Sequence, residues 1–139
     1  MKRILTLACL CLFLAAQASA QTAEPVTRTL SASFEKVWAI SESVLKSLGW
    51  DIDERDKAVG WIVTDSRGVD FKDFGVYGEG TRHKLRLRFK AVGETRTSVS
   101  VEREVYREER ILWMRERKPV QTQDRSVEVS VLNAIEKAI

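Results

Sequence analysis

Histidine and cysteine, the side chains that most often bind transition metals or act as nucleophiles, are scarce in this sequence. The only histidine is His83, and the only two cysteines, Cys9 and Cys11, lie close to the first residue. A carboxylate site needs clustered acids, and the closest approach to a cluster is Asp70 and Asp73, with a lysine between them. We therefore expect neither a metal ion nor a cofactor.

Long apolar runs are also missing, with one exception near the start. Ile4–Ala16 is uncharged and mostly apolar, but its 13 residues fall short of the roughly 20 that span a bilayer. A lysine and an arginine precede this run, and residues 18–20 read Ala-Ser-Ala, the pattern that a signal peptidase cuts. We expect residues 1–20 to be a secretory signal cut after Ala20. The remainder is then a periplasmic protein without a transmembrane segment.

A large net charge is lacking once such a signal is removed. The whole chain has a formal net charge of +3, and the signal would take Lys2, Arg3 and no acid with it, which leaves about +1. Both cysteines would leave as well, so the remaining domain would have no disulfide and no thiol. This balance predicts neither a nucleic acid nor an anionic membrane as the partner.

Motifs for catalysis are missing too. No G-x-S-x-G pattern surrounds a serine, and no two of the 20 acids stand apart in an apolar setting, as a general acid and its partner would. The glycines of residues 75–80 lack the strand and helix context of a phosphate-binding loop. We interpret His83 as a half-exposed residue at the start of a strand. No catalytic residue is predicted.

The sequence does contain clear periodicity. After a short flexible lead over residues 21–25, residues 26–32 alternate as a strand does. Ser33 can cap a helix over 34–48, whose apolar residues recur at steps of three and four. Gly49 follows, where a left-handed cap residue is favoured.

Two hairpins are predicted next. The first joins residues 50–53 to 58–65 through a polar turn over 54–57. The second joins a strand that begins at His83 to a strand that ends at Tyr106, with a turn near Glu94.

The second hairpin has a basic stripe on one face. A turn centred near Glu94 would place Arg88 opposite Ser100, Arg86 opposite Glu102 and Lys84 opposite Glu104. Cross-strand pairs of opposite charge stabilise a sheet by a few tenths to about 1 kcal/mol each. We therefore favour a solvated, cross-paired face over a site for a polyanion, and we expect no nucleic-acid partner.

The remaining segments complete the predicted fold. Residues 66–82 contain four glycines, which disfavour regular structure, and residues 107–118 either extend the preceding strand past a bulge or form a covering turn. A final amphipathic helix runs over 124–139 with Asp124 as its cap. The sequence thus predicts one α+β domain over 26–139. It has an antiparallel sheet of about five strands with two helices packed on one face, in the helix-grip-like order β-α-β-β-β-β-α.

Two groups of apolar side chains are candidates for a partner or ligand surface, because loops carry binding function more often than sheets do. They are Phe71, Phe74 and Tyr77 in the glycine-rich segment, and Ile111, Trp113 and Met114 in the later one. If they are buried they are core residues, and if they are exposed they form an interaction surface. Both alternatives stay open at this point.

Residues 34–65 contain a pattern of spaced residues that can be compared with known families. It has an early helix tryptophan, then "L-x-x-L-G", an "x-I-x-x-x-D-x-x-x-G" turn and an "I-x-T" strand. The matching positions are Trp38, Leu45, Leu48, Gly49, Ile52, Asp56, Gly60, Ile62 and Thr64. This pattern resembles the repeated domain of BamC-like lipoproteins of the outer-membrane assembly machine. The resemblance implies a helix-grip fold and an envelope location, and it supplies no catalytic residues.

Three hypotheses for function follow. The first is a non-catalytic periplasmic accessory or binding domain that contacts an envelope or outer-membrane assembly protein through residues 66–82 and 111–114. The second is a carrier of a small apolar ligand or lipid in a cavity between helices and sheet. Its lining would include Trp38, Trp50, Trp61 and Phe89. The third and least favoured is a hydrolase that uses His83 and carboxylates.

Overall fold

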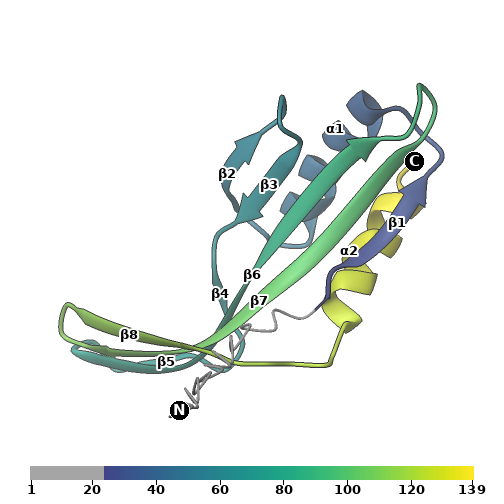
Figure 1. Ribbon diagram of the computed structural model, residues 1–139. Helices are drawn as coiled ribbons and strands as arrows, with labels where there is room; N and C mark the ends of the chain where they lie inside the picture. Colours follow the sequence, from purple (N-terminus) through teal and green to yellow (C-terminus); the bar gives the residue numbers. More distant parts are fainter. Residues whose placement is uncertain (1–23) are drawn as a thin grey trace, which may run out of the picture.

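The computed structural model describes residues 24–139, which form two helices and eight strands (Figure 1). In chain order the elements are β1 (Val26–Leu30), α1 (Phe34–Ser47), β2 (Ile52–Asp56), β3 (Trp61–Thr64), β4 (Arg67–Gly68), β5 (Lys72–Asp73), β6 (Tyr77–Ala91), β7 (Thr97–Ile111), β8 (Met114–Pro119) and α2 (Ser126–Lys137). The signal predicted over residues 1–20 lies outside the described residues. Only Glu24 and Pro25 of the predicted lead are described.

All the strands belong to one antiparallel sheet. Its central order is β2-β3-β6-β7-β1, while β4 and β5 pair with β6 and β8 pairs with β7. The predicted α+β class, with two helices and an antiparallel sheet, is confirmed. The predicted count of about five strands is too low. Residues 66–82 and 107–118 pair with the long central strands, whose backbone groups would otherwise stay without protein partners.

The central hairpin of β6 and β7 is longer than predicted. Each strand has 15 residues, so β6 begins six residues before His83 and β7 continues to Ile111. The register is continuous from end to end, with no bulge. It pairs Lys84 with Glu104, Arg86 with Glu102 and Arg88 with Ser100, as the sequence predicted.

Helix α1 confirms the predicted helix over 34–48 to within one residue. Ser33 occupies the N-cap position in an extended conformation, but its side chain forms no capping hydrogen bond. At the other end Gly49 has a φ of +76° and its N–H donates to the Lys46 carbonyl, while the Trp50 N–H donates to the Leu45 carbonyl at 2.8 Å. These two bonds form a Schellman motif, which fixes Trp50 against the last turn of the helix.

The first hairpin forms three residues later than predicted. Its turn covers residues 57–60, because the Asp56 carboxylate accepts a hydrogen bond from the Val59 N–H at 3.0 Å and Gly60 adopts a φ of +88°. Within β3, Ile62 and Thr64 are buried, whereas Trp61 and Val63 are half-buried on the opposite face.

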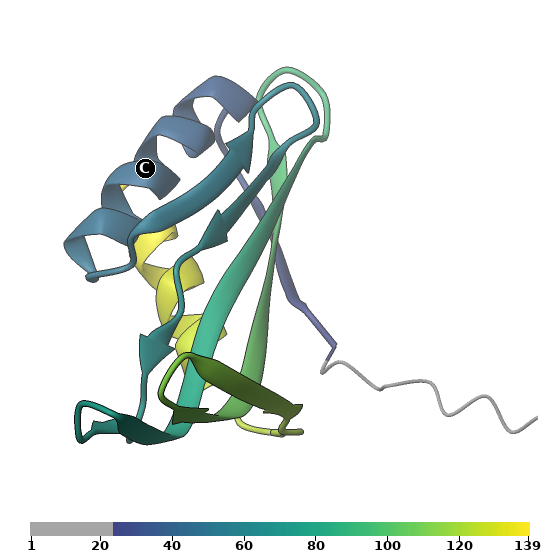
Figure 2. The same ribbon diagram turned by 90° about the vertical axis from the view of Figure 1, so that its left-hand side faces the viewer.

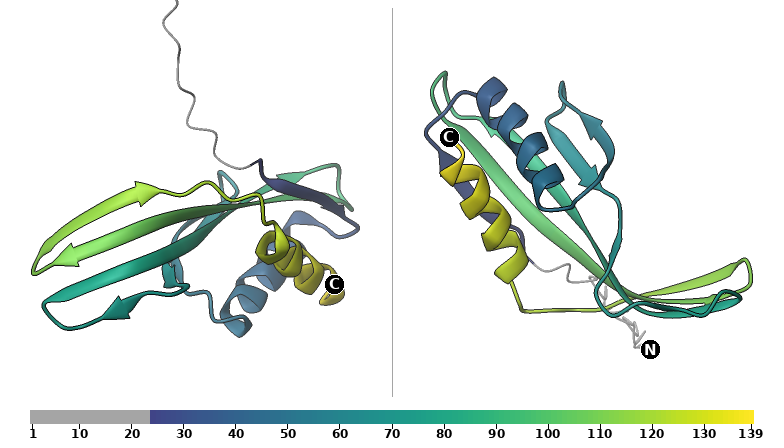
Figure 3. Two further views of the ribbon diagram at one scale, coloured as in Figure 1. Left: turned by 90° about the horizontal axis from the view of Figure 1, so that it is seen from below. Right: turned by 180° about the vertical axis from the view of Figure 1, so that it is seen from behind.

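The two helices lie side by side against one face of the sheet (Figures 2 and 3). Buried apolar residues of both helices, the neighbouring strands and the segments beside α1 form one core. Its members are Leu30, Ala32, Val37, Trp38, Val44, Leu45, Trp50, Ile62, Leu85, Leu87, Phe89, Val99, Val101, Val131, Leu132 and Ile135. We call this part of the molecule the body.

Helix α2 begins two residues after the predicted cap. Arg125 is at the N-cap position, and the Asp124 carboxylate accepts a hydrogen bond from the Ser126 N–H at 2.9 Å. Arg103, which interrupts the apolar pattern of β7, donates to the Asp124 carbonyl and lies 3.5 Å from the buried carboxylate of Glu128. The interruption therefore marks an ion-pair contact between β7 and the start of α2.

Beyond the helices the sheet continues as a projecting arm (Figures 1 and 3). The arm consists of β5, residues 77–82 of β6, residues 106–111 of β7, and β8. Two turns, over 74–76 and 112–113, close its far end.

Candidate binding site at the tip of the arm

The two turns at the end of the arm lie next to each other. The Leu112 N–H donates to the Val76 carbonyl at 2.6 Å, and the Phe74 N–H donates to the Tyr77 carbonyl at 2.7 Å. Tyr77 also pairs with Ile111 across the central hairpin. The glycine-rich segment and residues 111–114, which are far apart in the sequence, therefore meet at one place.

The arm tip is apolar and exposed. We define it as Phe74, Val76, Tyr77, Ile111, Leu112, Trp113 and Met114. Trp113 is 83 % exposed, and Phe74 and Val76 are each more than 60 % exposed. The rings of Phe74 and Tyr77 stack with their centroids 6.3 Å apart. Of the two alternatives that the sequence left open, exposure holds for every residue of this group except Tyr77, which is half-buried.

Leu112 occupies an unusual backbone conformation. It is the first residue of the two-residue turn between Ile111 and Met114, and its φ of +55° is the only positive value among the described non-glycine residues. Tight hairpin turns usually place glycine, asparagine or aspartate at such a position, because a side chain with a Cβ is strained there. Leu112 holds this strained conformation although its side chain is about half exposed, which points to a functional role.

Phe71 is not part of the exposed tip and lies on one face of the arm. Its ring packs on the strand where β6 has glycines, and an added Cβ would approach Phe71 to 2.9 Å at Gly78 and 2.6 Å at Gly80. The Arg82 guanidinium lies 5.0 Å from the centre of the ring. The glycines thus make room for residues 70–71 to cross one face of the arm, so Phe71 is a supporting residue of the tip.

An ion pair between a buried carboxylate and a half-exposed arginine lies on the same face of the arm. The Glu108 side chain is almost fully buried, and its carboxylate accepts a hydrogen bond from Arg117 Nε at 2.7 Å. The Arg117 guanidinium also lies 5.0 Å from the ring of Tyr106, which is itself buried. These contacts join β7 to β8 and give the arm a small core of its own.

A second ion pair joins the two turns of the tip. Arg110 donates to the Asp73 carboxylate at 2.5 Å and to the Gly75 carbonyl at 2.8 Å. The Gly75 N–H, and then the charge of Arg110, lower the pKa of Asp73 below its ordinary value. Asp73 therefore stays ionised through the neutral range, and the connection between the turns is retained.

Sequence reasoning missed Val76 and Leu112 as tip residues. Leu112 belongs to the apolar run over 111–114, but nothing in that run shows which residues will form the turn. Val76 lies among glycines that suggest a loop. The available signal was local, namely a four-residue apolar run flanked by charges, and it predicted exposure only as one of two alternatives.

His83 lies in the body and is not part of the arm tip. It is 7 % exposed, not half-exposed as predicted, because Trp50 folds over it with the ring centres 4.8 Å apart. Burial, and then the charges of Arg103 and Arg67, lower the pKa of His83 to about 4. The imidazole is therefore neutral at pH 7 and is held in the body as a structural group.

The aromatic residues named for an internal ligand cavity are divided between two places. Trp38 and Phe89 pack together in the core, with ring centres 5.1 Å apart, and Trp50 is buried beside His83. Trp61 lies on the opposite face of the sheet. These four side chains do not surround one common space.

No protein-family model matches the chain, and no curated protein does. Among residues 24–139 no group of three or more His, Cys, Asp or Glu side chains is arranged to hold a metal ion. Neither of the described helices has the length and apolar character needed to cross a membrane.

Proposed function

We propose that this protein is a non-catalytic periplasmic accessory domain that inserts the arm tip into an apolar site on an envelope protein. The observation that carries the proposal is the gathering of exposed apolar side chains from two distant segments at the end of a projecting arm. The signal-like pattern of residues 1–20 supports the compartment. The BamC-like pattern of residues 34–65 makes the outer-membrane assembly machinery the first place to look for the partner.

The chemistry of the tip suits a protein groove. An exposed tryptophan carries about 150–250 Å² of surface that a partner can bury, and tryptophan is enriched among the residues that dominate binding energy. Trp113 at the extreme end would serve as the anchor, with Phe74 and Leu112 beside it. The arm is held by ladders of hydrogen bonds on both sides of β6 and β7, so little ordering is needed on binding.

The charges around the tip favour a protein over a membrane surface. Segments that lie in a membrane interface are typically rich in lysine and arginine on their polar side, which attracts anionic lipid. Here acids and bases alternate, since Asp73 pairs with Arg110 and Glu116 lies between Arg115 and Arg117. A rim of mixed charge is typical of the polar border of a protein interface.

The experiment places a photo-crosslinking amino acid at Trp113 in cells. Its matched control is the same amino acid at Val92, an exposed apolar residue in the turn between β6 and β7, at the other end of the hairpin. We expect a discrete protein adduct from position 113 and none from position 92. Mass spectrometry of the adduct then identifies the partner.

A second variant separates contact from function. Leu112→Gly combined with Phe74→Ser keeps the Trp113 position and removes apolar surface beside it, so the adduct should weaken at least tenfold while the thermal unfolding midpoint does not fall. Equal adducts from positions 113 and 92, or an adduct that is unchanged by this double substitution, would contradict the proposal. Binding of the purified protein to vesicles of anionic phospholipid, lost in the same variant, would identify a membrane instead and overturn the protein assignment.

A further inference from the structure

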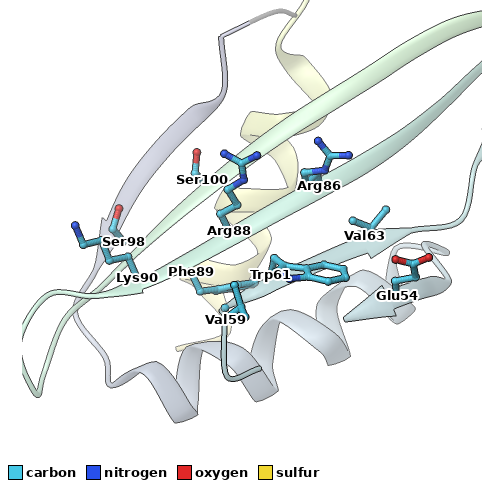
Figure 4. Close-up of a pocket in the computed structure, with 11 residues that line it drawn as sticks. Glu54, Val59, Trp61, Val63, Arg86, Arg88, Phe89, Lys90, Ser98 and Ser100 are labelled. Carbon is cyan, nitrogen blue, oxygen red and sulfur yellow. The ribbon is translucent and has the colours of Figure 1, made fainter. Parts of the chain in front are cut away.

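A second surface lies on the face of the sheet opposite the helices. It is a groove of about 730 Å³ in the body, bordered by the β2–β3 hairpin and crossing β6 and β7 (Figure 4). That volume is in the range of sites for small ligands. The arm tip contributes no residue to it, so the groove is independent of the function proposed above.

The strand register places side chains of different chemical types side by side across this groove. One row runs from Trp61 on β3 to Arg88 on β6 and Ser100 on β7. The next rows place Arg86 beside Val63 and Lys90 beside Ser98. An indole, a line of cations and a line of hydroxyl groups therefore lie side by side on one surface.

The cations of the groove lack acidic partners. Arg86, Arg88 and Lys90 are exposed, and none of them forms an ion pair within the described part of the chain. The neighbouring Lys84, in contrast, pairs with Glu104 at 3.4 Å. The predicted cross-pairing is therefore present in the register but forms an ion pair at one position only.

The spacing of the three cations is regular. They alternate along one strand, so neighbouring side chains emerge roughly 7 Å apart on the same face. Glu54 and Glu102 lie toward the Arg86 end, whereas serines face Arg88 and Lys90. Positive charge therefore accumulates toward the Lys90 end of the groove with no opposing charge on the adjacent strand.

We propose that this groove binds an acidic oligosaccharide. Arginine guanidinium groups match carboxylates and sulfates in paired hydrogen bonds, and the regular spacing suits a chain with repeated anionic groups. Trp61 offers one apolar surface for a sugar ring, and Ser98 and Ser100 offer hydroxyl partners for its polar edge. A single-stranded nucleic acid fits less well, because it needs several aromatic platforms and the groove offers one half-buried indole.

The experiment titrates the full purified protein with tetragalacturonic acid and, as the neutral control, maltotetraose. Calorimetry should show binding of the acidic sugar alone, and the affinity should fall as salt is raised. Backbone amide NMR signals of Ser98 and Ser100 and the indole signal of Trp61 should shift, while those of the arm should not. Equal binding of maltotetraose, or shifts spread over the arm, would overturn the proposal.

Paired variants separate this site from general charge. Arg86→Gln with Arg88→Gln should weaken binding at least tenfold. Lys72→Gln with Arg115→Gln removes the same charge from two exposed arm residues that form no ion pair among residues 24–139, and it should change affinity less than twofold. Equal losses in both pairs would mean non-specific attraction and contradict the site. Tighter binding of a six-residue oligothymidine than of the sugar would assign the groove to nucleic acid and reject the saccharide.

Discussion

The body and the arm are built from the same two strands, yet they are stabilised in different ways. In the body, β6 and β7 present leucine, valine and phenylalanine to the helices, and residues such as Leu85, Leu87 and Val101 are fully buried. In the arm the same strands carry glycine, glutamate and arginine, with no helix above them. The body is stabilised by an ordinary apolar core. The arm depends on the hydrogen bonds between its strands, on residues 70–71 that cross one face, and on the ion pair between Arg117 and the buried Glu108.

The body and the arm also differ in which face of the sheet is covered. Buried positions on β6 are Leu85, Leu87 and Phe89 in the body but Gly78 and Gly80 in the arm, so the covered face changes sides along one strand. The helices cover one side, and residues 70–71 cover the other. The arm is therefore a separate packing unit that holds the apolar tip away from the core.

The largest expected effect comes from breaking the body. Leu87→Ala removes a fully buried side chain beneath the helices and should lower the free energy of unfolding by about 3–4 kcal/mol. Urea unfolding followed by circular dichroism measures this loss. Because the helices depend on this core, Leu87→Ala should lower the stability of the helices themselves. If Leu87→Ala left the helices at full stability and loosened only the arm, Leu87 would not belong to the core of the body.

A smaller effect should be confined to the arm. At Gly80 the φ is +146° and a Cβ would lie 2.6 Å from the Phe71 backbone, so Gly80→Ala should destabilise the arm by about 3 kcal/mol. Hydrogen exchange should speed up at Thr81 and Arg107 and stay slow at Leu87. The control is Gly75→Ala, where φ is +82° and no atom lies within 4 Å, with an expected cost of about 1 kcal/mol. Equal exchange rates in the two variants would show that the close approach of Phe71 is not why position 80 is a glycine.

The sequence predicted the body better than the arm, and the reason is physical. Period-two alternation identified the helix-facing side of the body strands, and it placed Arg86 opposite Glu102 correctly. That alternation assumes one covered face. On that assumption Tyr106 would face solvent together with Glu102 and Glu104, but it is buried, because at that point the covered face is the opposite side of the sheet.

The arm was harder to predict because its signals are those of loops. Glycine density in residues 66–82 predicted irregular structure, whereas Gly78 and Gly80 are strand residues that make room for Phe71. For the site, the sequence proposed Phe74, Trp113 and Met114 together, but it had no means of deciding between burial and exposure. That choice depends on the pairing of β6 with β7, a contact between segments more than twenty residues apart.

An effect of intermediate size is the pH dependence of the stability of the body, which we attribute to His83. The pKa of His83, lowered to about 4 in the folded protein, is near 6.5 in the unfolded chain, so only the unfolded chain takes up a proton between these values. Stability is full above pH 6.5 and falls as the pH drops toward 4, by about 2 kcal/mol between pH 7 and pH 5. Urea unfolding at the two pH values measures the loss.

The control for this pH effect is His83→Asn, which has no titrating group at the position and should show a smaller difference between pH 7 and pH 5. His83 is the only histidine in the chain, so no other imidazole can account for the change. An undiminished difference in the variant would show that carboxylates, not His83, control stability in this range.

The smallest effect has the opposite sign and tests the tip most directly. Leu112→Gly relieves the strain of a φ of +55° and should raise the free energy of unfolding by about 0.5–1 kcal/mol, while removing apolar surface that is about half exposed. The matched control is Val59→Gly, an exposed turn residue without positive φ, which should lose stability instead. If Leu112→Gly both stabilises the fold and weakens the partner adduct, the leucine serves binding. Stability alone would favour glycine at this φ. A loss of stability in Leu112→Gly would instead make this leucine part of the arm's own structure, and the proposed contact would then rest on Trp113 and Phe74.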